Sequence, residues 1–318
     1  MNTLDKSSLR IVFFGTPDFG IPSLNMILSE GYNLVACISQ PDKKSGRGHK
    51  IKMTPVKEWA KEHGIPCYQP AKISSDEGVS LLNSLKPDLC ITAAYGQILS
   101  DNVLSVPVFG IYNIHASLLP EYRGSAPINW AIIKGEKESG VTIMKTVRRL
   151  DAGDIILQKR TMIGSDETAG ELYTRLSILG AEALSDALGL LVSDSINPVK
   201  QDESSSSYFP MFAREFGKID FNTTCSDIYN FYRGTFPYPG CYFFYKGIKI
   251  KVVELSFDRC SHNYNPGMIV KANHKDGIII SCYDGLISID KIKYPGKGVT
   301  DSCSFTLGHE LETNYYLE

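Results

Sequence analysis

The sequence predicts an α/β protein with a Rossmann-like, mostly parallel sheet covered by helices on both faces, followed by a smaller C-terminal β-barrel of OB-like type. Three observations predict this fold. Apolar runs alternate with helical segments from residue 9 onward, a polar serine-rich stretch interrupts that pattern, and short strands separated by glycine turns follow it. We therefore expect a first domain at 1–193, a linker at 194–209 and a second domain at 210–318.

The first domain opens with a β-α-β unit. Residues 9–14 form an apolar, β-branched run, a helix is expected from Pro22 to Gly31, and residues 34–39 form a second apolar run. Strands joined in this way make right-handed crossovers, which predicts a parallel sheet. The other elements expected in this domain are helices at 55–63, 76–85, 127–134 and 168–192 and strands at 89–92, 110–114, 141–147 and 155–160, the last two forming a hairpin.

The polar stretch at 202–207 marks the change to a different architecture. It contains four consecutive serines and has no apolar period, so it is typical of a linker. Short strands with glycine-rich turns suggest a small β-barrel beyond it. The strands expected there lie at 241–245, 247–255, 268–272, 277–282 and 285–292.

Composition narrows the class of protein. The chain has 318 residues, 43% of them hydrophobic and 21% charged, which is enough apolar material for two cores and excludes a disordered chain. The net charge is -2, so a polyanionic partner has to be met by a local basic patch. Eight cysteines without a Cys-x-x-Cys pair predict free, buried thiols and no metal site. With no signal-peptide core and no membrane span, we expect a cytoplasmic monomer.

Two glycine-containing loops follow the first two strands. The loop at 14–20 lacks both the Gly-x-Gly-x-x-Gly pattern and a P-loop lysine, so it predicts a tight turn rather than a nucleotide cofactor. The loop at 40–52 is basic, and its spacing fits equally a solvated loop and an arm that grips a phosphate backbone. The side chains available for that grip are Lys43, Lys44, Arg47, His49 and Lys50.

The segment 113–130 is the strongest candidate for chemistry. Asn113 and His115 stand two residues apart at the end of a short strand, so both side chains lie on one face and an amide donor and an imidazole converge. The carboxyl edge of a parallel sheet is where ligands bind in such folds. A structural role for a single histidine remains the alternative.

A second carboxylate-bearing turn lies between the two strands of the expected hairpin. Asp151 and Asp154 flank Gly153 there. Aspartate and glycine are ordinary turn formers, so one interpretation is that the segment is only a turn. The other is that Asp151 orients His115 and favours its charged form, although sequence spacing alone does not bring the two together.

Taken together, these segments resemble the folate-dependent formyltransferase family. The resemblance runs through nearly the whole chain, including a second domain. Its motifs are the opening strand and turn at 13–19, the basic loop at 40–48, the segments 94–99 and 113–127, the acidic turn at 150–154, and the second-domain segments 213–221 and 233–240. Ala152 and Asn129 depart from the residues usual in the family, and neither belongs to the three candidate catalytic residues.

The resemblance implies an enzyme that transfers the formyl group of 10-formyltetrahydrofolate to the α-amino group of methionyl-initiator tRNA, with no metal. It implies Asn113, His115 and Asp151 as catalytic residues and residues 43–50 as a contact to tRNA. It also implies that the second domain binds tRNA. The nine lysines and arginines at 246–297 are candidates for a basic surface that contacts the tRNA phosphates. The residues implied to line the folate site are Ala93, Ala94, Tyr95, Gly96, Ser117, Leu118, Leu119 and Pro120.

Two rival interpretations remain open at this point. A formyltransferase that acts on an amino-sugar nucleotide shares the 113–127 motif, but is expected to have a nucleotide-sugar slot in place of the basic arm. A non-catalytic RNA-binding protein built on the same scaffold is the second rival, and the intact trio of Asn113, His115 and Asp151 argues against it.

Overall fold

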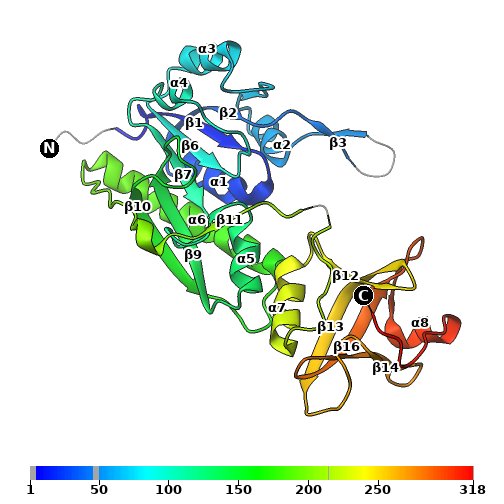
Figure 1. Cartoon of the computed structure of the whole chain (residues 1–318). Coiled ribbons are helices and arrows are strands. Elements are labelled where there is room, and N and C mark those ends of the chain that lie inside the picture. Colours follow the sequence, from blue (N-terminus) through cyan, green and yellow to red (C-terminus); the bar gives the residue numbers. More distant parts are fainter. Residues whose placement is uncertain (1–4, 46–49, 214, 318) are drawn as a thin grey trace. The chain divides into compact units, whose positions relative to one another are not determined.

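The computed structural model describes residues 5–45, 50–213 and 215–317, which pack into two compact units (Figure 1). The first unit comprises Met1–Pro127, Glu138–Met162 and Tyr173–Phe209. The second comprises Ile128–Lys137, Ile163–Leu172 and Pro210–Glu318. Within the described residues, none of the helices has both the length and the apolar character that a membrane span requires.

A seven-stranded sheet organises the first unit. Its strand order is β10-β9-β7-β6-β1-β2-β5, in which the five strands from β7 to β5 are parallel and β9 and β10 are antiparallel. The expected mostly parallel sheet with a terminal hairpin is confirmed. The strands are β1 (Arg10–Gly15), β2 (Asn33–Ile38), β5 (Cys67–Tyr68), β6 (Leu89–Ala93), β7 (Ile111–His115), β9 (Glu138–Lys145) and β10 (Ile155–Met162).

Helices cover both faces of this sheet, as the sequence predicts. Strand alternation sends Val12 of β1 into a core with Leu82 of α3 on one face. On the other face, a Cβ added to Gly180 of α6 would lie 3.0 Å from the Ile114 side chain of β7. The helices of this unit are η1 (Asp18–Gly20), α1 (Ile21–Ser29), α2 (Pro55–Glu62), α3 (Asp76–Leu85), α4 (Asp101–Leu104) and most of α6 (Ala169–Val192), whereas α5 (Pro127–Ile133) belongs almost entirely to the second unit.

The segment expected as a linker, 194–209, is fastened to the first unit. Val199 exchanges two 2.8 Å backbone hydrogen bonds with Ile155 at the start of β10. After a 3-10 turn η2 (Glu203–Ser205), strand β11 (Tyr208–Phe209) pairs in parallel with β8 (Arg123–Gly124). The backbone of this segment is therefore tied to the first unit at both ends, whereas residues 202–205 between them are exposed. The domain boundaries at 193 and 210 stay a prediction.

The second unit contains a separate antiparallel sheet of order β12-β13-β16-β15-β14, with β17 paired to β16. The expected second β domain is thus confirmed, although no ladder that closes β14 onto β12 into a barrel is among the described pairings. Its strands are β12 (Cys241–Tyr245), β13 (Ile248–Arg259), β14 (Ile269–Asn273), β15 (Gly277–Cys282), β16 (Gly285–Lys293) and β17 (Val299–Asp301), accompanied by the helices α7 (Cys225–Thr235) and α8 (Ser302–Gly308).

The second-unit segment 233–240 has a packing role at its first two residues. The buried guanidinium of Arg233 donates to the carbonyl oxygens of Gly164 and Glu167, at 3.0 and 3.2 Å. A Cβ on Gly234 would come within 2.6 Å of the Ile133 side chain, so only glycine allows α7 to approach α5 this closely. These residues therefore join α7 to the segments beside it in the second unit.

Candidate active site

Strand β7 places Asn113 and His115 at the carboxyl end of the parallel strands, with Ile114 between them on the opposite face. Asn113 is the register partner of Thr92 on β6, and the Thr92 hydroxyl donates to the Asn113 side-chain oxygen at 2.8 Å. Because the amide oxygen is occupied in this way, the amide N–H groups of Asn113 face other partners. The predicted convergence of an amide donor and an imidazole on one face is consistent with this arrangement.

The His115 ring lies between two hydrogen-bond acceptors. Its side chain is buried, Nε2 is 3.0 Å from the Tyr122 carbonyl oxygen, and Nδ1 is 3.8 Å from Oδ1 of Asp151. A neutral imidazole carries one N–H and can donate to only one acceptor, whereas a protonated ring can serve both. The approach of Asp151 to His115, which sequence spacing could not establish, is therefore present.

The carboxylate of Asp151 is fixed by a second contact. Oδ2 accepts a 2.8 Å hydrogen bond from the backbone N–H of Gly124, so one oxygen faces His115 and the other holds the turn at 122–124. Asp151 has φ +48°, in the left-handed region that costs free energy for a residue with a side chain. Such a conformation persists only where the surroundings hold it.

The residues predicted to line the folate site divide into core and loop positions. The Tyr95 ring packs edge-on against Phe14 with centroids 5.2 Å apart, inside the core. Leu119 and Ala93 are buried, and Leu118 packs next to Gly140 of β9. Ser117 donates its hydroxyl to the Glu121 carbonyl oxygen at 2.8 Å. Ala94 and Gly96 are exposed, whereas Pro120 is half-buried.

The structure also has a surface cleft of about 830 Å³. One of the segments that line it, 97–102, directly follows residues 93–96 in the chain. None of the eight predicted folate residues is among those that line it, and sequence analysis missed its lining. Only the structure reveals it: Ile98 is 85% exposed there, and an exposed apolar side chain is the kind that a ligand covers. The lining residues are Gln40, Pro41, Lys43, Ala71, Lys72, Ser74, Gln97, Ile98, Leu99, Ser100, Asp101, Asn102 and Arg148.

The basic loop at 40–52 contains a short hairpin rather than only loop. Strands β3 (Lys43–Ser45) and β4 (Lys50–Lys52) pair antiparallel, with Lys43 opposite Lys52. Lys43 is exposed and lies at the cleft, and its ammonium donates to the Gln40 side-chain oxygen at 3.1 Å. Lys44 and Lys50 are strand residues, whereas Arg47 and His49 lie outside the described residues.

The sequence profile of formyl transferase matches residues 9–188, and that of the formyl transferase C-terminal domain matches residues 212–310. The chain belongs to the formyl transferase family. It is 44% identical over 308 residues to the methionyl-tRNA formyltransferase of Ruminiclostridium cellulolyticum, covering 96% of this chain and 98% of that protein. It is 41% identical over 307 residues to the methionyl-tRNA formyltransferase of Geobacter metallireducens, covering 96% and 97%. The resemblance that the motifs indicate is confirmed.

Solved structures of formyl transferases share the fold. WlaRD, a sugar 3N-formyl transferase solved in the presence of dTDP and 5-N-formyl-THF, matches with a TM-score of 0.65 and 23% identity over 91% of this chain and 99% of that one. HypX from Aquifex aeolicus in complex with tetrahydrofolic acid matches with a TM-score of 0.64 and 15% identity, covering 96% of this chain and 50% of that chain. At these identities the likeness establishes the α/β architecture alone.

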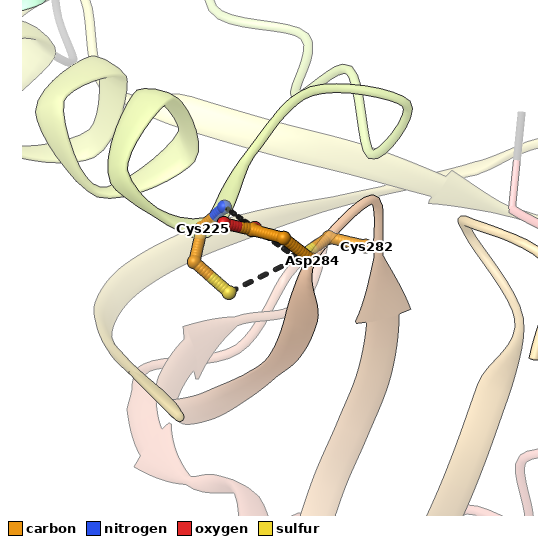
Figure 2. A group of neighbouring side chains, drawn as sticks. All are labelled: Cys225, Cys282 and Asp284. Carbon is orange, nitrogen blue, oxygen red and sulfur yellow. Dashed lines mark hydrogen bonds between the residues drawn. The ribbon is translucent and has the colours of Figure 1, made fainter. Parts of the chain in front are cut away.

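A cluster of potential metal ligands in the second unit lies outside the motifs described above. Cys225, Cys282 and Asp284 bring two thiols and a carboxylate together, with the sulfurs 3.1 Å apart (Figure 2). The Asp284 carboxylate accepts from the N–H of Cys225 at the start of α7, and the Cys282 thiol donates to the Gly285 carbonyl oxygen at 3.3 Å. Burial raises the pKa of the Cys225 thiol strongly. The hydrogen bonds present make the cluster a cap at the start of α7 beside two buried thiols.

Proposed function

We propose that the protein transfers the formyl group of 10-formyltetrahydrofolate to the α-amino group of methionyl-initiator tRNA. The observation that carries the proposal is the meeting of His115 and Asp151, 36 positions apart in the chain, at 3.8 Å, beside the oriented amide of Asn113. The extent of identity to relatives named methionyl-tRNA formyltransferase, over nearly the full length of both chains, supports this acceptor rather than an amino-sugar nucleotide.

The reaction assigns a different task to each of the three side chains. The amine attacks the formyl carbon, a C–N bond forms, and negative charge develops on the formyl oxygen. Asn113 donates a hydrogen bond to that oxygen. His115 gives a second hydrogen bond and carries a proton from the amine to the folate nitrogen as the old C–N bond breaks, for which Nε2 has to exchange the Tyr122 carbonyl oxygen for the reactants while Nδ1 stays toward Asp151. Asp151 orients the imidazole.

We assign the cleft beyond Tyr95 to part of the formylfolate donor. Its exposed Ile98 and the buried Leu99 beside it offer an apolar wall to a flat ring system, and Lys72 supplies a cation for a carboxylate of the glutamyl tail. The residues at 93–96 and 117–120 do not line this cleft, and those at 93–96 support it from behind. The carbonyl of Tyr95 illustrates that support, since the Gln40 amide donates to it at 3.0 Å.

For the tRNA we propose two basic contacts. The first is the hairpin arm with Lys43, Lys44, Arg47, His49 and Lys50, of which Arg47 is proposed to enter the acceptor arm. The second is an exposed face of the antiparallel sheet, here called the lysine face. Within the described residues its lysines make no ion pair, and two of them, Lys249 and Lys218, lie over the rings of Tyr242 and Phe244. The members of the lysine face are Lys218, Lys249, Lys251 and Lys293.

The register of three strands builds the lysine face. Lys251 of β13 pairs with Tyr242 of β12 on one side and Lys293 of β16 on the other. The Lys249 ammonium lies 3.3 Å from the centroid of the Tyr242 ring, and burial followed by the charge of Lys251 lowers the pKa of Lys249. Unpaired cations at close spacing repel one another, and a phosphate backbone would relieve that repulsion. The other basic residues of 246–297 include several that are neutralised, such as Lys291 by Glu254 at 2.5 Å.

The decisive assay follows formyl transfer from labelled 10-formyltetrahydrofolate to methionyl-tRNA, with an amino-sugar nucleotide offered as a competing acceptor. We expect formyl-methionyl-tRNA as the product and no formylated sugar. Formylation of the sugar alone would replace the proposed acceptor, and tRNA binding without consumption of formylfolate would support a non-catalytic RNA-binding protein. We further propose that the protein is cytoplasmic and monomeric. Light scattering of the purified chain checks the oligomeric state.

A further inference from the structure

The segment expected as a linker passes directly over the turn that carries Asp151. Its first anchor is the pair of backbone hydrogen bonds between Val199 and Ile155, and its last is the pairing of β11 with β8. The Ser207 hydroxyl also accepts from the N–H of Tyr122 at 2.9 Å. The residues from 199 to 209 therefore touch both turns that supply the acceptors around His115.

Gln201 lies between these anchors, and its side-chain amide is fully used. Its nitrogen donates to the carbonyl oxygens of Asp151 and Gly153, at 2.9 and 2.7 Å. Its oxygen accepts two hydrogen bonds from the guanidinium of Arg123, at 3.0 and 2.8 Å. Because one end must donate and the other must accept, only one orientation of the amide satisfies all four contacts.

The partners of Gln201 are the two turns that the Asp151 carboxylate joins. Arg123 is 3% exposed and precedes Gly124, whose N–H donates to Asp151 Oδ2. Asp151 itself holds a left-handed φ of +48°, which needs external support. The amide of Gln201 supplies that support by binding the carbonyl of the strained residue and that of the glycine two positions later.

We infer that Gln201 is a positioning residue for the Asp151 carboxylate: its amide, locked by Arg123, holds the 151–153 turn so that Oδ1 faces His115. This inference rests on the role proposed for Asp151 in formyl transfer. Gln201 reaches neither His115 nor the reacting atoms and acts through Asp151. Loss of its amide lets the turn relax toward unstrained backbone and draws the carboxylate away from the imidazole.

The test is Gln201→Met, which keeps length and removes all four hydrogen bonds. We expect kcat for formyl transfer to fall by roughly 10- to 100-fold, the order expected when a catalytic group moves by about an ångström. KM for methionyl-tRNA and for formylfolate should change less than about twofold. Gln201→Glu, which keeps the acceptor for Arg123 and loses both donors to the turn, should also lose activity and provides a second variant if Gln201→Met does not fold.

Glu203→Gln is the matched control. Glu203 accepts from the same guanidinium, at 3.0 and 3.2 Å, and from exposed Arg149 at 2.7 Å, but unlike Gln201 it makes no described hydrogen bond to residues 151–153 themselves. Its kcat should remain within about twofold of wild type. An equal loss in this variant would mean that general anchoring of the segment matters, and would overturn the specific role of Gln201.

A double-mutant cycle with Asp151→Asn separates this inference from the proposed function. If Gln201 acts through Asp151, adding Gln201→Met to Asp151→Asn should cost almost nothing further, although each single variant is slow. Full additivity of the two losses, or a folded Gln201→Met enzyme with wild-type kcat, would refute the inference and leave the proposed function intact. A fully active Asp151→Asn enzyme would instead remove the role of Asp151 on which the inference rests.

Discussion

The candidate active site and the lysine face differ in whether their polar and charged side chains have partners within the protein. At the site, each polar group has a defined protein partner: Asn113 with Thr92, His115 with Tyr122 and Asp151, and Asp151 with Gly124. On the lysine face the ammonium groups are exposed and make no ion pair among the described residues, although neighbouring lysines of the same unit are neutralised.

The difference follows from what each region has to do. Stabilising an oxyanion requires donors that are already oriented before the reaction, since reorganisation at that moment costs free energy. Holding a phosphate backbone requires available positive charge, and a cation already paired to a carboxylate contributes little. A fixed hydrogen-bond network is therefore suited to stabilising a transition state, and a set of unpaired lysines is suited to binding a phosphate backbone.

The largest effect is expected where the fixed network is broken. Asn113→Ala removes the donor proposed for the formyl oxygen, and loss of one such donor typically slows the chemical step by about 10²- to 10³-fold. Single-turnover formylation measures this rate, and tRNA affinity measured beside it should stay unchanged. A rate within about twofold of wild type would exclude Asn113 from the oxyanion site.

Removing charge from the lysine face should have the opposite signature. For Lys251→Ala combined with Lys293→Ala we expect kcat to be retained and KM for methionyl-tRNA to rise roughly tenfold. The slope of log affinity against log salt should fall by about two, one for each lost phosphate contact.

Lys291→Ala is the matched control for the lysine-face variant. Lys291 lies on the same strand and face as Lys293 but is neutralised by Glu254. Its removal should leave the salt slope unchanged. If the control and the double variant weaken tRNA binding equally, the distinction between paired and unpaired lysines carries no functional meaning.

A smaller effect should follow from loosening the network without removing a catalytic group. Thr92→Val keeps shape but deletes the hydroxyl that orients the Asn113 amide, and a hydrogen bond of this kind contributes about 1 kcal/mol. Single-turnover formylation should therefore slow by about fivefold. Thr146→Val serves as control, because the Thr146 hydroxyl is buried with no hydrogen-bond partner in the described structure. Equal rates for the two variants would show that amide orientation is unimportant.

The smallest expected effect is on the free energy of unfolding, which repulsion between the lysines of the lysine face should lower. Lys251→Thr relieves the like-charge pair with Lys293 and should raise the free energy of unfolding by about 0.3 kcal/mol, since like charges opposite one another destabilise a sheet. Lys291→Thr should lower that free energy because it breaks the pair with Glu254. Denaturant unfolding of both variants checks the opposite signs, and a loss of stability in Lys251→Thr would contradict the account.

Strand and helix periods made most of the fold predictable. The limits of α3 at 76–85 and of β12 at 241–245 agree with the sequence expectation, because the Ser75 cap and the alternating apolar residues are local signals. The linker interpretation of 194–209 rested on the serine run. Composition does not reveal that Gln201 and Ser207 find partners 48 or more positions away.

The candidate site was predictable as a set of residues but not as a geometry. Period two placed Asn113 and His115 on one face, whereas the approach of Asp151 depends on a hairpin turn with a left-handed backbone. The cleft beyond Tyr95 was missed for a different reason. Its walls come from four separate segments around residues 40, 72, 98 and 148, and no local pattern links them.

The central claim is that His115, held between Tyr122 and Asp151, carries out the chemical step and not the binding of substrates. Rapid-quench measurement of a single turnover by His115→Ala, with methionyl-tRNA and formylfolate both saturating, tests it most directly. We expect the rate to fall at least about 100-fold while the affinity for tRNA remains that of wild type. A near-wild-type rate, or a loss explained entirely by weaker tRNA binding, would contradict the account.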